Sequence, residues 1–125
     1  MMQFSAAPWR ILDEDHLRYC VEAAQLHSQF GQEILELARQ SSLTGEPIVR
    51  HMAYEFPEAS FETIQDQFML GSFILVAPVI TKGMRTRVVA FPAGTWDGDD
   101  GSIVEGPSTK QIDVPLSRLP YYRKR

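Results

Sequence analysis

The sequence is poor in cysteine, with Cys20 as the single example among 125 residues. A lone thiol forms neither a disulfide within the chain nor a cysteine-rich zinc site, and we expect Cys20 to be buried and unreactive. A chain without disulfides suits a reducing compartment, so the expected location is cytoplasmic. No signal peptide is expected either, because Met1, Met2 and Gln3 are followed by neither a basic region nor an apolar one.

A long apolar run and an excess of basic residues are both missing. The longest apolar stretch, Phe68–Ile80, has 13 residues and is interrupted by Gly71, Ser72 and Pro78, whereas a membrane-spanning helix needs about 20. The 12 basic residues are outnumbered by 16 acidic ones, which gives a net charge of −4. The sequence therefore predicts a protein that neither spans a membrane nor binds nucleic acid in a general way.

Motifs for cofactors and metals are also missing. The sequence contains neither a phosphate-binding loop nor G-x-G-x-x-G, so no nucleotide cofactor is expected. His16 and His27 return to the same face of a helix, but about 16 Å apart along its axis, which is too far to share a metal ion. The acidic run at 97–101 lacks the spacing of a calcium loop and is better explained as a polar turn between strands. His51 is expected to be a packed polar residue and not a ligand.

The first half of the sequence favours helix. Residues 13–40 are nearly all good helix formers without a proline, and Asp13 at the start is a suitable N-cap. Gly31 is expected to bend or divide this segment, and Gly45 to end it. Apolar residues recur at spacings of three and four, which predicts one apolar stripe formed by Leu17, Val21, Ala24, Ile34, Leu35 and Ala38.

The second half favours strands, and six of the eight prolines lie beyond Glu55. Ile48–Tyr54 does not alternate cleanly between apolar and polar residues, which is typical of a strand covered on both faces in a parallel sheet. A short helix capped by Ser60 and running through Met69 is expected next. Three further strands are expected, the first two as a hairpin and the third after a turn-rich segment at 96–107, and they cover residues 73–80, 85–91 and 108–114.

Several short motifs occur in an order and spacing that belong together. The most specific are T-G-E-P-I-V-R at 44–50, Y-E-F-P at 54–57, D-Q-F-M-L-G at 66–71 and L-V-A-P-V at 75–79. Matching segments follow as far as residue 120, and another precedes them at 4–9. Jointly, these motifs resemble glycoside hydrolase family 31, the family of α-glucosidases and α-xylosidases.

The resemblance implies a fold class of α/β passing into β, namely the end of a (β/α)8 barrel followed by part of an antiparallel β-sandwich domain. On this interpretation residues 1–72 are the C-terminal segment of the catalytic barrel, and residues 73–125 begin the β domain. Residues 13–40 would be a late barrel helix, Ile48–Tyr54 the eighth strand, and Phe61–Leu70 the helix that closes the barrel.

The resemblance also implies an activity, the retaining hydrolysis of α-glycosides by two aspartates. Neither the nucleophile segment, of the type W-x-D-M-N-E, nor the later acid/base has a match here, and Trp96-Asp97 is expected to be structural. No catalytic residue is therefore assigned. Three residues are expected to contact the sugar: Ser5, which stands where many members have a histidine, Trp9 in the matched loop, and Arg50 at a strand end, where barrels place their active sites.

Two functions are compatible with these observations. The chain is either part of an α-glycoside hydrolase, with the activity and the carbohydrate substrate belonging to a longer parent, or a stand-alone, non-catalytic module for carbohydrate binding or protein interaction built on that scaffold. In both cases we expect the isolated chain to be inactive. Because a barrel strand would lack its neighbours, apolar surface and strand edges are expected to be exposed and to promote self-association.

Four polar residues near the predicted strand are expected to be structural. Arg50 and Glu55 flank it, and Asp66 and Gln67 precede the next apolar run. Since buried charges need partners, we expect these side chains to pair with one another or with the backbone.

Overall fold

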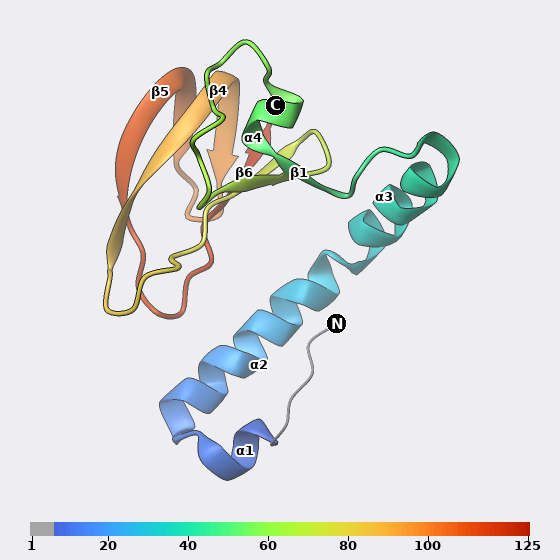
Figure 1. The fold of residues 1–125 in the computed structure, drawn as a ribbon. Helices are drawn as coiled ribbons and strands as arrows, with labels where there is room; N and C mark the ends of the chain where they lie inside the picture. The colour runs from blue at the N-terminus through green and yellow to red at the C-terminus, as the bar shows by residue number, and fades with distance from the viewer. Residues whose placement is uncertain (1–6) are drawn as a thin grey trace.

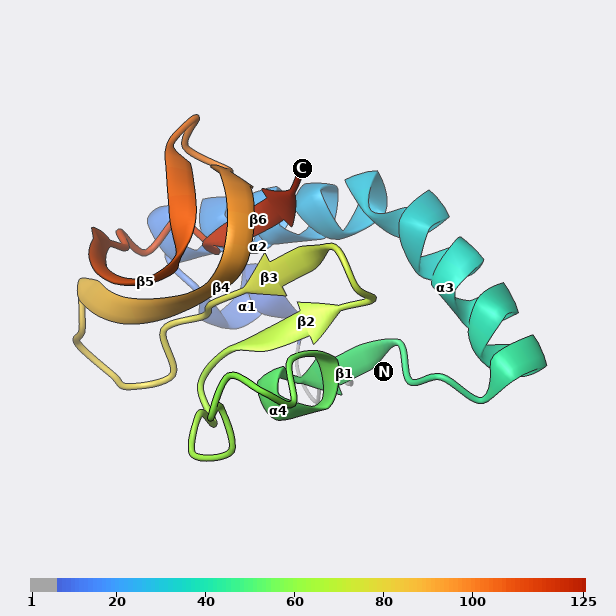
Figure 2. The same ribbon diagram turned by 90° about the horizontal axis from the view of Figure 1, so that it is seen from above.

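The computed structural model describes residues 7–125, in which a helical arm precedes a six-stranded sheet (Figure 1). The arm consists of α1 (Pro8–Ile11), α2 (Glu14–Gln29) and α3 (Gly31–Thr44). The longer two helices run along one side of the sheet (Figures 1 and 2). None of the helices in this part of the chain is long and apolar enough to cross a membrane.

The two capping residues of the arm are those that the sequence predicts. The Asp13 side chain accepts a hydrogen bond from the backbone N–H of His16 at 2.9 Å and caps α2. Gly45, with a φ of 79°, ends α3 in the left-handed conformation that glycine favours. The segment is divided at Phe30, next to the glycine expected to divide it, and α3 continues past the predicted end at residue 40 to Thr44.

The sheet has the strand order β1-β2-β3-β6-β4-β5, and every neighbouring pair is antiparallel (Figure 2). Three short strands therefore form one side of the sheet, a long hairpin forms the other, and the last strand lies between them. The strands are β1 (Val49–His51), β2 (Phe68–Leu70), β3 (Ile74–Val76), β4 (Thr86–Gly98), β5 (Ile103–Asp113) and β6 (Tyr121–Lys124).

The strand expected at 48–54 is shorter than predicted, and its placement in a parallel sheet is wrong. The chain leaves β1 directly into the one-turn helix α4 (Met52–Glu55), which the exposed His51 caps by accepting from the Ala53 N–H at 3.1 Å. β1 pairs antiparallel with β2 at the edge of the sheet, so Val49 is 57% exposed. The irregular apolar pattern arises because Met52 is buried from a helix and not from a strand.

The prediction of a helix at 61–70 is also wrong. The structure describes this segment throughout, and it consists of turns followed by β2. Gln67 exchanges two hydrogen bonds with the backbone of Ala90 on β4, at 2.7 and 3.0 Å, and Arg87 donates to the Asp66 carbonyl at 2.7 Å. These contacts with a distant strand outweigh the local helical preference.

The expected hairpin between 73–80 and 85–91 is wrong as well. β3 covers only part of the first segment and pairs with β2 and β6. The domain boundary expected between residues 72 and 73 lies in the turn that joins β2 to β3. β4 pairs with β5 instead.

The β4–β5 hairpin takes up most of the segment expected to be turn-rich, 96–107, because its turn is confined to 99–102. The polar turn predicted at 97–101 is confirmed, but it begins at residue 99, because Asp97 and Gly98 still belong to β4. The strand expected at 108–114 is the second half of β5.

Alternate residues of the central strands face opposite sides of the sheet. On one side Met69, Leu75 and Tyr122 are fully buried, in a core completed by Met52, Ala77, Val89, Phe91, Trp96 and Val104. On the other side the strands present an apolar surface toward α2, formed by Phe68, Leu70, Ile74, Val76 and Tyr121.

The arm is attached to this second face near the junction of α2 and α3. The Phe30 ring meets the Tyr121 ring edge-on, with 5.1 Å between centroids. Arg123 on β6 donates two hydrogen bonds to the Glu33 carboxylate, one of them at 2.8 Å. Leu37 packs directly over Gly71 in the β2–β3 turn.

The predicted apolar stripe of the arm meets the sheet only in part, through Ile34. Neither α2 nor α3, both described throughout, contains a fully buried residue. Val21 and Leu35 of the predicted stripe are 49% and 45% exposed, and Cys20, expected to be buried, is partly exposed. The residues of the arm that line the space above the strands include Tyr19, Ala23, Leu26, Phe30 and Ile34.

We expect Gly71→Ala to destabilise the fold by about 1–2 kcal/mol, because an L-residue is strained in the left-handed conformation. The φ of Gly71 is +60°, and an added Cβ would lie 2.7 Å from Leu37 Cδ2. Gly31→Ala is the matched control, since its Cβ meets nothing within 4 Å. Urea unfolding of both variants checks the prediction, which fails if the two changes have equal effects.

Acidification should weaken the attachment of the arm. The Arg123 guanidinium holds the pKa of Glu33 below its ordinary value of 4.5, so this ion pair stabilises the fold fully above that value and is lost as the pH falls through the lowered pKa. Wild type should therefore melt at a higher temperature than Glu33→Gln at neutral pH and at the same temperature at about pH 2. A melting difference that is independent of pH would contradict this assignment.

Candidate functional site

Arg50, one of the residues expected to contact sugar, is held by its own chain. Its Nη1 atom donates to Glu55 Oε2 at 2.6 Å and to Ser72 Oγ at 2.8 Å, and its Nε atom donates to the Pro47 carbonyl at 3.0 Å. The Arg50 and Glu55 side chains are only 13% and 18% exposed. The expected pairing of these two residues is confirmed, and it joins β1 to α4 and to the β2–β3 turn.

The other two expected contacts lie elsewhere. Trp9 is on α1, with 71% of its surface exposed, and α1 contacts α2 but not β1. Figure 1 shows α1 and β1 far apart, beyond opposite ends of α2. The structure thus does not bring Trp9 and Arg50 together, and Ser5 lies outside the described residues.

A second polar cluster joins the segment before β2 to β4. Arg87 is 5% exposed, donates to the carbonyls of Asp66 and Pro78, and pairs with the Asp66 carboxylate at 3.1 Å. Gln67 is 4% exposed and bonds the backbone of Ala90. The backbone pairing expected for Gln67 is confirmed, whereas the Asp66 carboxylate pairs with the Arg87 side chain and not with the backbone or one of the other three residues. Sequence reasoning missed Arg87, although a charge followed by two valines in a predicted strand is a signal for a buried ion that needs partners.

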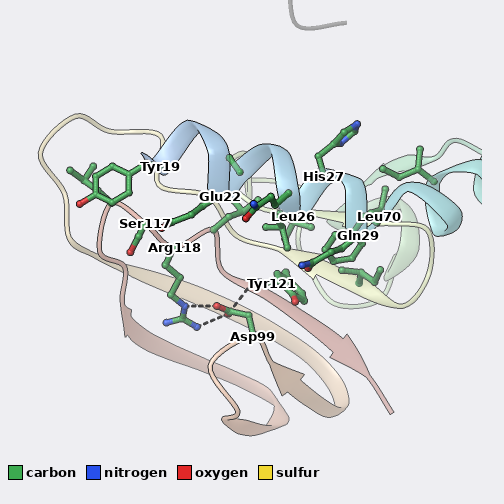
Figure 3. Close-up of a pocket in the computed structure, with 18 of the residues that line it drawn as sticks. Tyr19, Glu22, Leu26, His27, Gln29, Leu70, Asp99, Ser117, Arg118 and Tyr121 are labelled. Carbon is green, nitrogen blue, oxygen red and sulfur yellow. Dashed lines mark hydrogen bonds and ion pairs between the residues drawn. The ribbon is translucent and has the colours of Figure 1, made fainter. Parts of the chain in front are cut away.

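A groove of about 620 Å³ lies between α2 and the sheet (Figure 3). Its floor is the apolar surface of β2, β3 and β6, its roof is α2, and one end is closed by Leu116–Leu119. Tyr19, Leu26 and Tyr121 reach into it, whereas the ring of His27 is directed away from the strands (Figure 3). The size is that of a ligand pocket. The polar and charged residues of its lining are Glu22, Gln25, His27, Gln29, Asp99, Ser117 and Arg118.

Two of the charged residues that line the groove, Asp99 and Arg118, belong to a tightly paired ion cluster. Arg118 donates to both carboxylate oxygens of Asp99, at 2.8 and 2.7 Å, and lies 2.9 Å from Asp100 Oδ2. The hydrogen bonds that Arg118 donates to Asp99 raise the pKa of Arg118 above its ordinary value, so the guanidinium stays charged. This cluster ties the β4–β5 turn to the segment before β6.

Carboxylates that could otherwise serve chemistry are engaged by arginines. Asp97 accepts three hydrogen bonds from Arg125, which lower the pKa of Asp97. Together with the Asp99–Arg118 pair, this explains the acidic run at 97–101 as a charged turn. Among residues 7–125 no cluster of His, Cys, Asp and Glu could hold a metal ion.

The chain is similar in sequence to parts of proteins named as glycosidases. The family model of the glycosyl hydrolase family 31 C-terminal domain matches residues 45–125. The myogenesis-regulating glycosidase of Mus musculus is 33% identical over 125 residues, which is 97% of this chain and 17% of that protein. Alpha-glucosidase 2 of Bacillus thermoamyloliquefaciens is 29% identical over 120 residues, which is 94% of this chain and 15% of that protein.

Solved structures give the same result. A family 31 dextranase of Flavobacterium johnsoniae superposes with a TM-score of 0.87 and 27% identity, over 94% of this chain and 15% of the dextranase. A family 31 alpha-xylosidase from a soil metagenome superposes with a TM-score of 0.85 and 30% identity, over 90% of this chain and 17% of the xylosidase. The chain thus spans less than a fifth of the length of these relatives. On the evidence of a family model that covers most of its sequence, the chain belongs to glycoside hydrolase family 31.

Proposed function

We propose that this chain is the part of a retaining α-glycoside hydrolase that supports the catalytic barrel, and that the activity and the carbohydrate substrate belong to a longer parent. In this proposal the arm is the last helical layer of the barrel and the sheet is the β domain packed against it. The observation that carries the proposal is that relatives about six times longer superpose on both parts, over 90–94% of the chain.

The charges of the sheet favour a supporting role over a catalytic one. A retaining pair needs two carboxyl groups about 5–5.5 Å apart, one of them a nucleophile. In the sheet domain Glu55, Asp66, Asp97 and Asp99 each face an arginine. Such carboxylates hold the fold together and are poorly placed to attack a sugar.

The relatives supply the substrate class. The dextranase structure contains glucose and the alpha-xylosidase structure contains xylose. We extend sugar binding to the parent of this chain, with Trp9 the better placed of the two described candidate contacts, because its side chain is exposed while that of Arg50 is occupied by Glu55 and Ser72.

A stand-alone binding module is the second candidate, and the groove under α2 is the feature that favours it. The two functions separate experimentally. If the isolated chain is a binding module, it should bind glucose or an isomaltose oligosaccharide in the groove. Calorimetry would detect this binding with wild type, and Leu26→Glu, a change in the groove, should weaken it. A supporting segment should show no such binding.

The isolated 125-residue chain should not hydrolyse 4-nitrophenyl α-glucoside or α-xyloside, because no catalytic aspartate pair is assigned in it. Release of nitrophenol is the measurement, with heat-unfolded chain as the background control. Hydrolysis above that background, abolished by replacing a single Asp or Glu of this chain, would overturn the proposal.

Arg50→Ala should lower the free energy of unfolding by about 1–3 kcal/mol, because it leaves the largely buried Glu55 carboxylate without its partner. Glu55→Gln is the matched variant, and the double variant should lose less than the sum of the two single losses. In a full-length parent the affinity for substrate should stay unchanged. A weaker affinity with unchanged stability would show instead that Arg50 contacts sugar.

A further inference from the structure

The end of β4 and the turn after it contain the only two Asp-Gly steps of the sequence, Asp97-Gly98 and Asp100-Gly101. Such a step is a weak point of a polypeptide, because glycine has no Cβ to shield its backbone nitrogen. That nitrogen can attack the side-chain carboxyl carbon of the preceding aspartate. The chain therefore carries two steps at which the backbone can rearrange without an enzyme or a cofactor.

The rearrangement exchanges one backbone link for another. The glycine nitrogen bonds to the aspartate Cγ, while the nitrogen's hydrogen and the carboxyl hydroxyl leave as one water, and a succinimide ring forms. One water then opens the ring, and opening at the original backbone carbonyl leaves the chain running through the side chain as isoaspartate. The first step needs a neutral carboxyl group, because a carboxylate has no hydroxyl to release.

The two Asp-Gly steps differ in the space around them. A Cβ added at Gly98 would lie 2.4 Å from Ser102 Oγ and 3.0 Å from Tyr122 Cε1. A Cβ added at Gly101 would meet no atom of the described residues within 4 Å. Gly98 also pairs with Tyr122 in the sheet, whereas Gly101 lies in the exposed turn. The second step therefore has room for the ring, and the first does not.

We propose that Asp100-Gly101 is a site of spontaneous isoaspartate formation, and that Arg118 and Ser102 restrain the reaction. Arg118 Nη2 lies 2.9 Å from Asp100 Oδ2, and the Ser102 backbone N–H donates to Asp100 Oδ1 at 3.0 Å. These donors favour the charged carboxylate, which does not react. The attacking nitrogen is held as well, because Gly101 N donates to the Gly98 carbonyl at 3.0 Å.

The charge state of Asp100 follows from these contacts. Hydrogen bonds from Ser102, and after them the charge of Arg118, hold the pKa of Asp100 below its ordinary value of 3.8. The neutral acid is therefore scarcer than in an unfolded chain. Water still reaches the group, since the Asp100 side chain is 41% exposed.

This site goes beyond the proposed function and does not depend on it. All its residues lie within 45–125, the part matched by the family model, and they contact one another within the sheet domain. The reaction therefore does not require any face of the arm to be open.

The test is to incubate the full 125-residue chain at physiological temperature and neutral pH for several weeks. Trypsin then releases residues 88–110, which contain both Asp-Gly steps and no internal Lys or Arg. Electron-transfer fragmentation of this peptide distinguishes isoaspartate at position 97 from isoaspartate at position 100. We expect isoaspartate to accumulate at Asp100 and not at Asp97, and more slowly than in the free, unfolded peptide 88–110.

Arg118→Gln and Ser102→Ala each remove one restraint. Each should speed the reaction at Asp100 at least about threefold, because a hydrogen bond to a charged group changes an equilibrium by about tenfold or more. Arg85→Gln is the matched control, since this exposed arginine bonds the Met84 carbonyl, and it should leave the rate unchanged. Circular dichroism checks that each variant is folded.

Ser102→Ala keeps the test valid if Arg118→Gln fails to fold, because it leaves the pair between Arg118 and Asp99 in place. The proposal fails if the folded chain and the free peptide react equally fast at Asp100, or if Asp97 reacts as fast as Asp100 in the folded chain. It also fails if the folded variants leave the rate at Asp100 unchanged, or raise the rates at both aspartates equally.

Discussion

The position of β6 between β3 and β4 is the constraint on which the rest of the structure depends. Its residues pair with Ile74–Val76 on one side and with Trp96–Gly98 on the other. Without β6 the short strands and the long hairpin share no pairing in the sheet. β6 also supplies a residue to each layer: Tyr122 to the core and Arg123 to the ion pair with Glu33 on the arm.

The arginines attach the irregular segments to this sheet. Arg50 holds α4, Arg87 holds the segment before β2, and Arg118 holds the turn between β4 and β5. Each guanidinium offers several donors in a planar fork, so one side chain can satisfy a carboxylate and backbone carbonyls together. Ion pairs therefore help to order these segments, beside the apolar contacts that Phe56, Phe61 and Ile64 make with the core.

Local signals in the sequence predicted some features and not others, for physical reasons. The start of the arm at Asp13, its end at Gly45 and the charged turn at 97–101 follow from capping and turn chemistry. The pairing of Arg50 with Glu55 followed from the cost of burying a charge. The helix predicted at 61–70 failed because Gln67 bonds to Ala90, a residue 23 positions away, and no local pattern records that contact.

The apolar stripe of the arm could not be assigned to the buried face from the sequence alone. Periodicity identifies apolar faces but not what covers them, and α2 has two such faces. Val21 and Leu35 of the predicted stripe are exposed, whereas Ile34 faces the sheet together with Tyr19 and the polar Glu22. For the candidate sugar contacts, sequence similarity chose the residues, but Arg50 is occupied by structural partners that only the folded chain brings near, such as Ser72.

The sequence separation across β6 has a consequence for how the chain folds. β3 is paired on both sides only after Tyr122 has come next to Leu75. Closing the long loop between these two residues costs conformational entropy before the new contacts compensate for it. The β4–β5 hairpin can form without closing a long loop, because its strands are joined by a short turn. Folding rate should therefore be governed by a late, non-local docking step in which residues 121–124 join two preformed pieces, as is usual for sheets of high contact order.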